Sequence, residues 1–290
     1  MDVLANWNST QFTTEYNFEI TNVEGEAHPT FISATHECLI RSGGGACTGT
    51  GSTDPSAPAV VGAEVRIVST FNVPVGTANS GVIRYAQAIT RLVVTTPSQE
   101  EMAPFAQEVQ AARVRCDSAP SMRNSTDCVI GDVEPIWDLR GYNNLDQYRR
   151  HVSLAQQSGL PGYPNDSGDG LPLNRITNKP DIDDRRAITC GGVTGPRTGE
   201  RDCDEYPMAS TQQGGGGGTG NGVARTFDPF CGIRDTGVTT LADINPSYRG
   251  LGWSVCLISL SQNRRAGSLQ SWFYTKSRVI NGDGFLVRAY

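Results

Sequence analysis

The 290-residue sequence has no run of roughly eighteen apolar residues, so we expect no membrane-spanning helix. It also lacks the CxxC pairs of a zinc site and the GxxxxGK[ST] motif of a phosphate-binding loop. The opening segment MDVLANWNST has neither a basic stretch nor an apolar core, and we do not expect it to be a signal peptide. These absences favour a soluble protein outside the common nucleotide-binding and zinc-finger classes.

Histidine is scarce, because the chain contains only His28, His36 and His151. No GxSxG segment accompanies them, and two of the three lie in the strand-rich front of the chain. A Ser–His–Asp triad would need residues from distant parts of the fold to meet. The sequence therefore does not favour a serine hydrolase.

Eight cysteines are scattered along the chain at spacings that do not fit a zinc site. The separations between Cys38 and Cys47 and between Cys116 and Cys128 are short and favour disulfide bonds. Disulfides form in oxidising compartments. We therefore expect a secreted, extracellular protein.

The net charge of −6 argues against a simple nucleic-acid binder. The charge is unevenly distributed, however. Residues 1–135 carry 7 Lys+Arg against 15 Asp+Glu, a net −8, whereas residues 136–290 carry 17 against 15, a net +2. The acidity belongs to the front of the chain, and the rear half is close to neutral.

The first 135 residues are dominated by stretches that alternate apolar and polar residues or run apolar with β-branched residues, bounded by Gly, Pro, Asn and Ser. This pattern predicts an antiparallel, sandwich-like β domain. Its clearest strand candidates are residues 15–23, 63–73 and 82–96.

Two other segments of this front domain are expected to differ. Residues 42–58, rich in Gly and Ser, are predicted to form a loop. Residues 98–114 suggest a short helix, with Ser98 as N-cap and Glu101 three residues later.

Residues 136–290 are predicted to form a second domain that mixes helices and strands, so the fold class is α+β. In the segment 263–278, Ala266, Leu269 and Phe273 fall on one helical face. The last third has the order strand, long loop, strand, helix, strand. The expected helices are residues 144–159, 181–190 and 263–278, and the clearest strands are residues 252–261 and 284–290.

Three acids crowd into the segment GERDCDEYPMAS, residues 199–210: Asp202, Asp204 and Glu205. Such a cluster suits a solvated turn, a metal site or a general base at a strand end. In a strand, Asp204 and Glu205 would point to opposite faces, so the two carboxylates would not flank one glycosidic bond as a retaining glycosidase requires.

Two other segments favour structural interpretations. NDSGDG, residues 165–170, begins like a calcium-binding EF-hand loop, but Ile176 stands where that loop requires Glu, so a surface turn is favoured. The run Gly214–Gly218 is typical of a flexible loop.

Metal-dependent hydrolysis remains open on the residues alone. Asn263 stands at the start of a predicted helix and is followed by Arg264 and Arg265, which supplies an oxygen ligand and cations for a phosphate. An Asn at a helix start most often caps the helix. Spacing alone leaves both roles open.

The blocks CDEYPMAST, NRRAGSL and FYTKSRVINGDGFLVRAY, preceded by PLNRITNKPDIDDRRAITC, resemble the NucA/NucB-type deoxyribonucleases. These are small secreted bacterial endonucleases of the ββα-metal group. The resemblance covers roughly residues 140–290. It implies that a β-hairpin and one helix hold a single divalent cation, Mg²⁺ or Mn²⁺, and that the partner is DNA, contacted through its backbone.

Carried over residue by residue, the resemblance implies roles for the acids and the asparagine. Asp204 is the general base and a candidate metal ligand, Asp202 is a supporting acid, Glu205 is an adjacent acid, and Asn263 is the main metal ligand. Arg264 matches an arginine of the family motif. Further candidates to hold the phosphate are Arg185, Arg186 and Arg265.

The sequence departs from the family pattern at Cys203, where other members carry arginine. Alongside the resemblance we expect Cys190 and Cys203 to form a disulfide that ties the arginine-bearing helix to the active strand. We expect Cys231 and Cys256 to form the fourth disulfide.

Two alternative functions stay open. One is a catalytically degenerate nuclease fold that acts as a binding or adhesion module. The other is a nuclease toxin domain delivered to competitor cells, which would have an inhibitor or immunity protein as a partner. Residues 1–135 lie outside the resemblance, and the sequence suggests no role for them.

Overall fold

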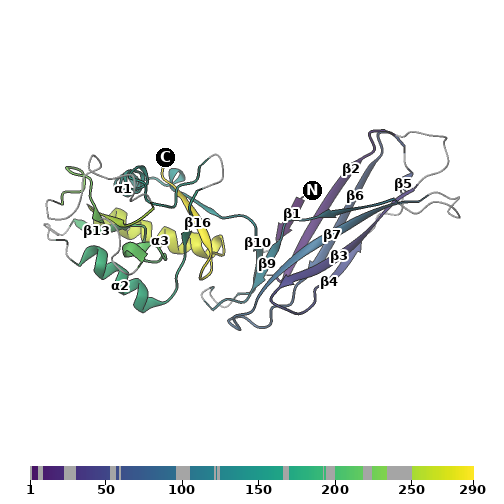
Figure 1. Ribbon diagram of the computed structural model, residues 1–290, viewed down its shortest axis with the longest axis horizontal. Helices are drawn as coiled ribbons and strands as arrows, with labels where there is room; N and C mark the ends of the chain where they lie inside the picture. Colours follow the sequence, from purple (N-terminus) through teal and green to yellow (C-terminus); the bar gives the residue numbers. More distant parts are fainter. Residues whose placement is uncertain are drawn as a thin grey trace. The chain divides into compact units, whose positions relative to one another are not determined.

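A computed structural model provides the fold of the chain, which divides into two compact units, Met1–Val133 and Glu134–Tyr290, called here the N-terminal and C-terminal units (Figure 1). The structure describes residues 2–5, 9–22, 31–52, 57–58, 60–95, 105–120, 122, 125–165, 170–191, 193, 200–217, 224–233 and 250–290.

The N-terminal unit consists of strands arranged in two sheets (Figure 1). One sheet has the order β1-β2-β6-β4, and the other has the order β10-β9-β7-β3-β5 with β8 also paired to β7. All pairings in both sheets are antiparallel. The strands are β1 (Asp2–Ala5), β2 (Gln11–Glu19), β3 (Phe31–Ser42), β4 (Thr48–Ser52), β5 (Ala57–Pro58), β6 (Glu64–Asn72), β7 (Ile83–Thr95), β8 (Phe105–Gln110), β9 (Val114–Asp117) and β10 (Asp127–Ile130).

The two sheets of this unit share one hydrophobic cluster. Phe12 and Phe71 from the first sheet pack with Ala86, Ala88 and Val114 from the second, and all five side chains are buried. Successive side chains of a strand point to opposite faces, and along β2 every second residue from Phe12 to Tyr16 is buried, so one face of the strand packs inward. Two disulfides, Cys38–Cys47 and Cys116–Cys128, add to the same cluster.

Two expectations for this unit are wrong. Residues 105–110 form strand β8 instead of a helix, because pairing with Ile89–Val94 of β7 overrides the local helix propensity; Ser98 and Glu101 lie outside the described residues. The expected loop 42–58 contains β4 and β5. A Cβ atom at Gly49 of β4 would lie 2.4 Å from the Phe71 ring, so glycine there permits the close pairing of β4 with β6.

The C-terminal unit combines helices with two three-stranded sheets, so the chain as a whole is α+β. One sheet has the order β11-β16-β12 and the other β13-β15-β14. Its elements are β11 (Ile136–Asp138), the short 3-10 helix η1 (Leu139–Gly141), α1 (Asp146–Gln157), β12 (Leu173–Asn174), α2 (Lys179–Cys190), β13 (Arg201–Tyr206), β14 (Ala224–Arg225), β15 (Trp253–Ser259), α3 (Leu260–Lys276) and β16 (Gly284–Arg288).

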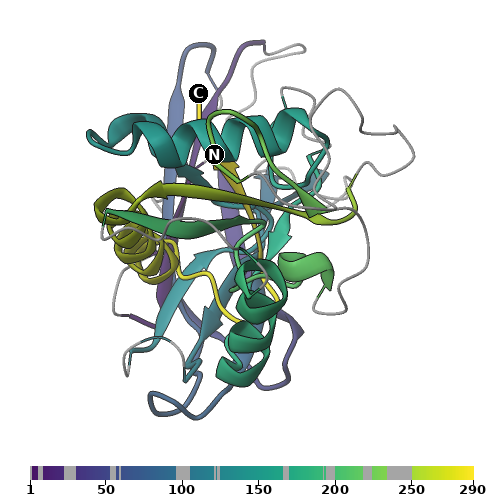
Figure 2. The same cartoon turned by 90° about the vertical axis from the view of Figure 1, so that its left-hand side faces the viewer.

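The helices contact the β13–β15 pair from two sides. Figure 2 shows α1 along one side of these strands and α2 along the other. The expected inward face of α3 is confirmed, since Ala266 and Phe273 are buried and Leu269 packs against the same core. None of the helices in the described parts of the chain is long and apolar enough to cross a membrane.

Phe273 lies at the centre of this core, in ring contact with Trp137, Tyr274 and Phe285. Its neighbour Trp272 is 53% exposed. Replacing a buried Phe with Ala removes apolar contacts and leaves a cavity, which costs about 3–5 kcal/mol. We expect Phe273→Ala to lower the free energy of unfolding by that amount in urea denaturation, and Trp272→Ala to change it little. Equal losses in the two variants would contradict the assignment of Phe273 to the core.

Candidate active site

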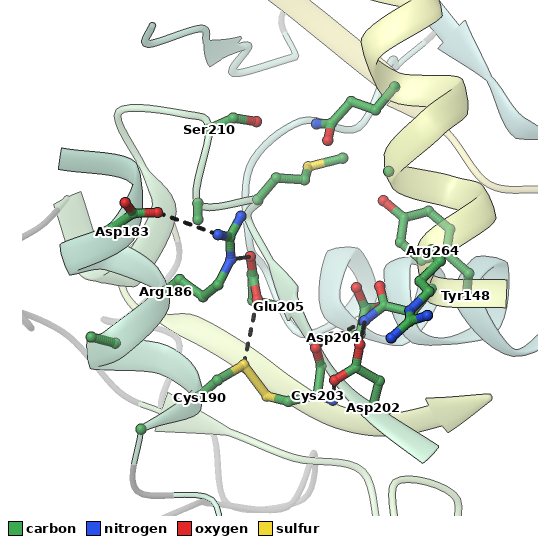
Figure 3. A pocket seen from close by; sticks show the side chains of 17 residues that line it. Tyr148, Asp183, Arg186, Cys190, Asp202, Cys203, Asp204, Glu205, Ser210 and Arg264 are labelled. Atoms are coloured by element: carbon green, nitrogen blue, oxygen red, sulfur yellow. Dashed lines mark hydrogen bonds and ion pairs between the residues drawn. A yellow bond between two sulfur atoms is a disulfide. The ribbon is translucent and has the colours of Figure 1, made fainter. Parts of the chain in front are cut away.

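The candidate site lies beside β13. Among the described strands, β13 pairs antiparallel with β15 alone, so its second edge is free. A cavity of about 630 Å³ opens along this edge, lined by residues of β13, α2 and α3 (Figure 3). An unpaired strand edge flanked by two helices thus forms the floor of an open groove.

Side chains of β13 alternate between the two helical sides. Asp204 contacts α1 and Asp202 contacts α3, whereas Cys203 and Glu205 face α2. This arrangement agrees with the expected opposite orientation of Asp204 and Glu205. Both residues nevertheless border the same cavity, because it runs along the strand edge where the two faces meet. The three acids therefore lie in strand β13 and not in a solvated turn.

Asp204 is almost fully buried, with 5% of its surface exposed. Its Oδ2 lies 2.6 Å from Nδ1 of His151, which comes from α1. Burial raises the pKa of the Asp204 carboxyl above its ordinary value, while the hydrogen bond to His151 opposes that shift. A carboxyl group with a raised pKa is a stronger base than an exposed aspartate.

Glu205 is a second acid with a perturbed pKa. Burial and then the neighbouring charge of Asp204 raise the pKa of Glu205 to about 7, against the opposing effect of Arg186. The Arg186 Nε lies 3.7 Å from Oε1 of Glu205. Oε2 lies 3.4 Å from the sulfur of Cys190, which is a contact and no hydrogen bond, because that sulfur is in a disulfide.

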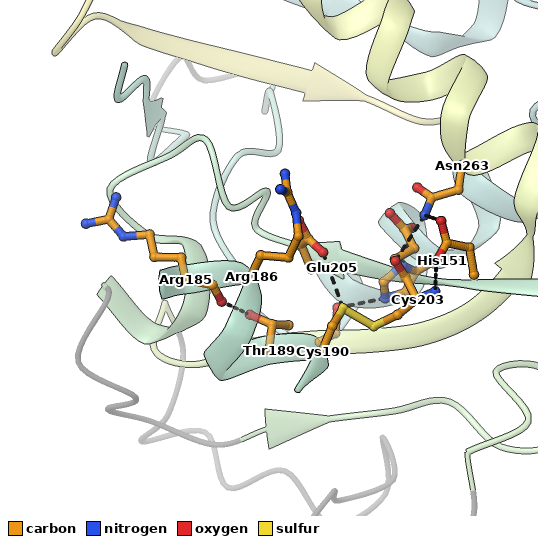
Figure 4. The surroundings of a disulfide bond; sticks show 11 residues. His151, Arg185, Arg186, Thr189, Cys190, Cys203, Glu205 and Asn263 are labelled. Carbon is orange, nitrogen blue, oxygen red and sulfur yellow. Dashed lines mark hydrogen bonds and ion pairs between the residues drawn. A yellow bond between two sulfur atoms is a disulfide. The ribbon is translucent and has the colours of Figure 1, made fainter. Parts of the chain in front are cut away.

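Asn263 reaches β13 from the first turn of α3. Its side-chain nitrogen donates to the backbone oxygen of Cys203 at 3.0 Å and to Oδ2 of Asp202 at 3.3 Å. These two hydrogen bonds use both hydrogens of the amide nitrogen. The amide oxygen is left as an acceptor, and Asn263 lines the cavity (Figure 4). Asn263 does not cap α3, whose N-cap position is Ser259.

A disulfide between Cys190 and Cys203 joins the end of α2 to β13 (Figure 4). The remaining disulfide of this unit is Cys231–Cys256. Together with the two in the N-terminal unit, these are the same four pairs that we expected. Cys203 is thus occupied by a covalent cross-link and cannot contact a phosphate.

The predicted arginines divide into two groups. Arg186 and Arg264 line the cavity, and both are exposed. Arg185 and Arg265 do not line it. Arg185 points away from Arg186 in Figure 4, and its Nη1 donates to the backbone oxygen of Thr211 at 3.0 Å.

Two residues near the site escaped the sequence prediction. His151 contacts Asp204 across 53 positions of the chain, and Tyr148, one turn before it on α1, lines the cavity. Burial raises the pKa of Tyr148 well above its ordinary value, and the charge of Asp204 adds to this. The available signal was a histidine on the apolar face of α1, among Tyr148, Val152 and Ala155.

The cavity offers oxygen donors suited to a hard cation. These are the carboxylates of Asp202, Asp204 and Glu205 and the amide oxygen of Asn263. Within the part of the chain that the structure describes, no group of three or more His, Cys, Asp or Glu forms a metal-binding set. Mg²⁺ typically uses one or two carboxylates and keeps several waters, so the residues present fit such a cation.

No family model, curated protein or solved structure matches this chain. The site must therefore be interpreted from its own chemistry.

The raised pKa of Glu205 predicts a pH-dependent stability. The folded-state pKa of about 7 exceeds the ordinary value of 4.5, so between these pH values the folded protein holds a proton that the unfolded chain has released. The free energy of unfolding of the wild-type protein therefore falls as the pH rises through this window. Relative to wild type, Glu205→Gln should gain stability as pH rises through this window, by at most about 3 kcal/mol above pH 7.

Urea denaturation from pH 4 to pH 8 in the presence of EDTA measures this difference. A constant offset between the two proteins across the whole range would show that Glu205 does not titrate with a raised pKa in the folded state.

Proposed function

We propose that the C-terminal unit is a metal-dependent, non-specific endonuclease that hydrolyses DNA phosphodiester bonds. The observation that carries this proposal is the combination found in one open cavity. The cavity is lined by a buried carboxylate with a raised pKa, that of Asp204, by the side chain of Asn263 and by two exposed arginines, Arg186 and Arg264. A base, an oxygen ligand and cations are the parts that phosphodiester hydrolysis requires.

In the proposed reaction, Asp204 takes a proton from a water beside the scissile phosphate as the water oxygen bonds to phosphorus. The bond from phosphorus to the leaving oxygen breaks, and that oxygen takes a proton from solvent. Its raised pKa brings its basicity closer to neutral pH, where general bases work best. The proton goes to the carboxylate oxygen that is not held by His151. Asp202 fixes the amide of Asn263 by accepting a hydrogen bond from its nitrogen, and so turns the amide oxygen toward the cavity.

Arg186 and Arg264 are the proposed phosphate contacts. Arg186 lies 3.5 Å from Asp183 and 3.7 Å from Glu205, so two long ion pairs hold its guanidinium at the cavity while more than half of the side chain stays exposed. A guanidinium group donates two parallel hydrogen bonds to phosphate oxygens. Neither contact reads a base, which supports hydrolysis without sequence specificity.

Asn263 would hold the cation, Mg²⁺ or Mn²⁺, with waters completing its coordination, and Asp204 would remain the base. When bound, such a cation supplies Lewis-acid stabilisation of the charge that develops on the phosphate and on the leaving oxygen. Antiparallel β13 and β15 followed directly by α3 support this assignment, because the ββα-metal nucleases hold their cation on a hairpin and one helix.

Secretion belongs to the same proposal. All eight cysteines form disulfides, and the described chain contains no free cysteine. Disulfides of this number are consistent with an oxidising compartment. An extracellular endonuclease would also meet the DNA that its cavity is proposed to bind.

Nicking of supercoiled plasmid DNA tests the proposed function. We expect the purified protein to nick plasmid with Mg²⁺ or Mn²⁺ and to stop when EDTA is added. Loss of a general base or a metal contact typically costs roughly 100-fold or more in rate. Asp204→Ala and Asn263→Ala should each show a loss of that order, and full activity in both variants would contradict the site assignment.

Arg264 and Arg265 provide a matched pair of controls, since only Arg264 lines the cavity. Arg264→Ala should reduce nicking, and Arg265→Ala should leave it close to wild type. A wild-type protein that binds plasmid without nicking it under any of these metals would instead indicate a degenerate binding module.

A further inference from the structure

His151 is fully buried within the C-terminal unit, and both of its ring nitrogens have partners. Nδ1 lies 2.6 Å from Oδ2 of Asp204, and Nε2 lies 2.9 Å from Oγ of Ser254. Figure 4 shows His151 on the same side of the view as Asn263, away from Arg185 and Arg186. A buried polar ring with both nitrogens bonded has one fixed orientation.

Three elements fix this ring. His151 comes from α1, Asp204 from β13, and Ser254 from β15, directly opposite Tyr206 in the antiparallel register. The Ser254 hydroxyl also lies 3.3 Å from the backbone oxygen of Tyr206, and the ring of Phe227 lies 6.1 Å from the imidazole. Rotating the imidazole would therefore break two hydrogen bonds inside a packed core.

His151 has no access to a substrate. It does not line the cavity, and Asp204 lies between the imidazole and the open groove. Any influence on a reaction in the cavity must pass through the Asp204 carboxylate. Asp204 is buried and also lines the cavity, so the contact that His151 makes inside the core acts on a carboxyl group that borders the groove.

We propose that His151 is a positioning residue for Asp204. A carboxylate oxygen can only accept, so Nδ1 carries the hydrogen that is donated to Oδ2. The backbone N–H of Glu205 bonds to the same carboxylate. These two donors hold the carboxylate in one orientation at the edge of the cavity that Asp204 lines. The proposal rests on the proposed nuclease function, for which Asp204 must meet a water in one orientation.

Amide substitutions separate positioning from packing, because each amide side chain replaces one ring nitrogen of His151. The Asn amide nitrogen occupies about the place of Nδ1 and can still donate to Asp204. The Gln amide nitrogen extends to about the place of Nε2, which meets Ser254 and leaves Asp204 without its donor. His151→Phe removes both contacts while keeping a ring. Val152→Ala removes a buried apolar group next to His151 that does not contact Asp204, and controls for lost stability.

The experiment measures kcat and KM for plasmid nicking, thermal unfolding, and Mn²⁺ affinity by calorimetry. We expect His151→Gln and His151→Phe to lose roughly 100-fold in kcat, as for a misplaced general base, while KM and Mn²⁺ affinity stay close to wild type. His151→Asn should recover most of kcat, and Val152→Ala should lose stability but not kcat. Wild-type kcat in His151→Gln, or no recovery in His151→Asn, would overturn the proposal.

A second measurement does not depend on activity. In proton–nitrogen NMR spectra, His151 should show an exchange-protected Nδ1–H signal that disappears in Asp204→Ala. Its absence from the wild-type protein would overturn the positioning contact. A wild-type protein that shows the signal but nicks no DNA would instead refute the proposed nuclease function, so the two failures are distinguishable.

Discussion

Strand β13 is paired with β15 along one edge, and its other edge borders a groove. Its side chains point to both faces of the strand, and helices hold them on each side. Residues pointing to one side are fixed by α1 and α3, through His151 and Asn263. Residues pointing to the other side are fixed by α2, through the Cys190–Cys203 disulfide. An edge strand normally presents unpaired backbone groups to the surroundings. Here that free edge borders a cavity, and contacts from α1, α2 and α3 hold the strand beside it.

The disulfide also determines which arginine reaches the site. Arg186 and Cys190 are four residues apart on α2 and therefore lie on the same helical face. Fixing Cys190 next to β13 brings Arg186 over Glu205, whereas Arg185 turns toward Thr211. Cys203 on the strand is thus cross-linked to α2, and the Arg186 side chain of that helix lines the cavity.

Local patterns in the sequence predicted much of this arrangement and missed the parts that depend on distant partners. The three helices of the C-terminal unit could be placed from the sequence to within about three residues at each end, since residues 144–159, 181–190 and 263–278 were expected and 146–157, 179–190 and 260–276 are observed. Strand β8 could not, because its Ala and Gln residues favour a helix until β7 pairs with them. The partners of His151 could not be predicted for the same reason, since Asp204 and Ser254 lie 53 and 103 positions away. Helical periodicity also could not decide between Arg185 and Arg186, because the phase of α2 relative to β13 is set by tertiary contacts.

The central claim is that the groove beside β13 binds a catalytic divalent cation through oxygen ligands. Anomalous diffraction from crystals soaked in Mn²⁺ tests it directly, because the scattering locates the metal without reference to activity. The predicted result is one strong anomalous peak in the cavity, at about 2.0–2.2 Å from the amide oxygen of Asn263, with waters completing its coordination. No peak in this cavity at Mn²⁺ concentrations that support nicking, or a peak only at some other place on the chain, would contradict the assignment.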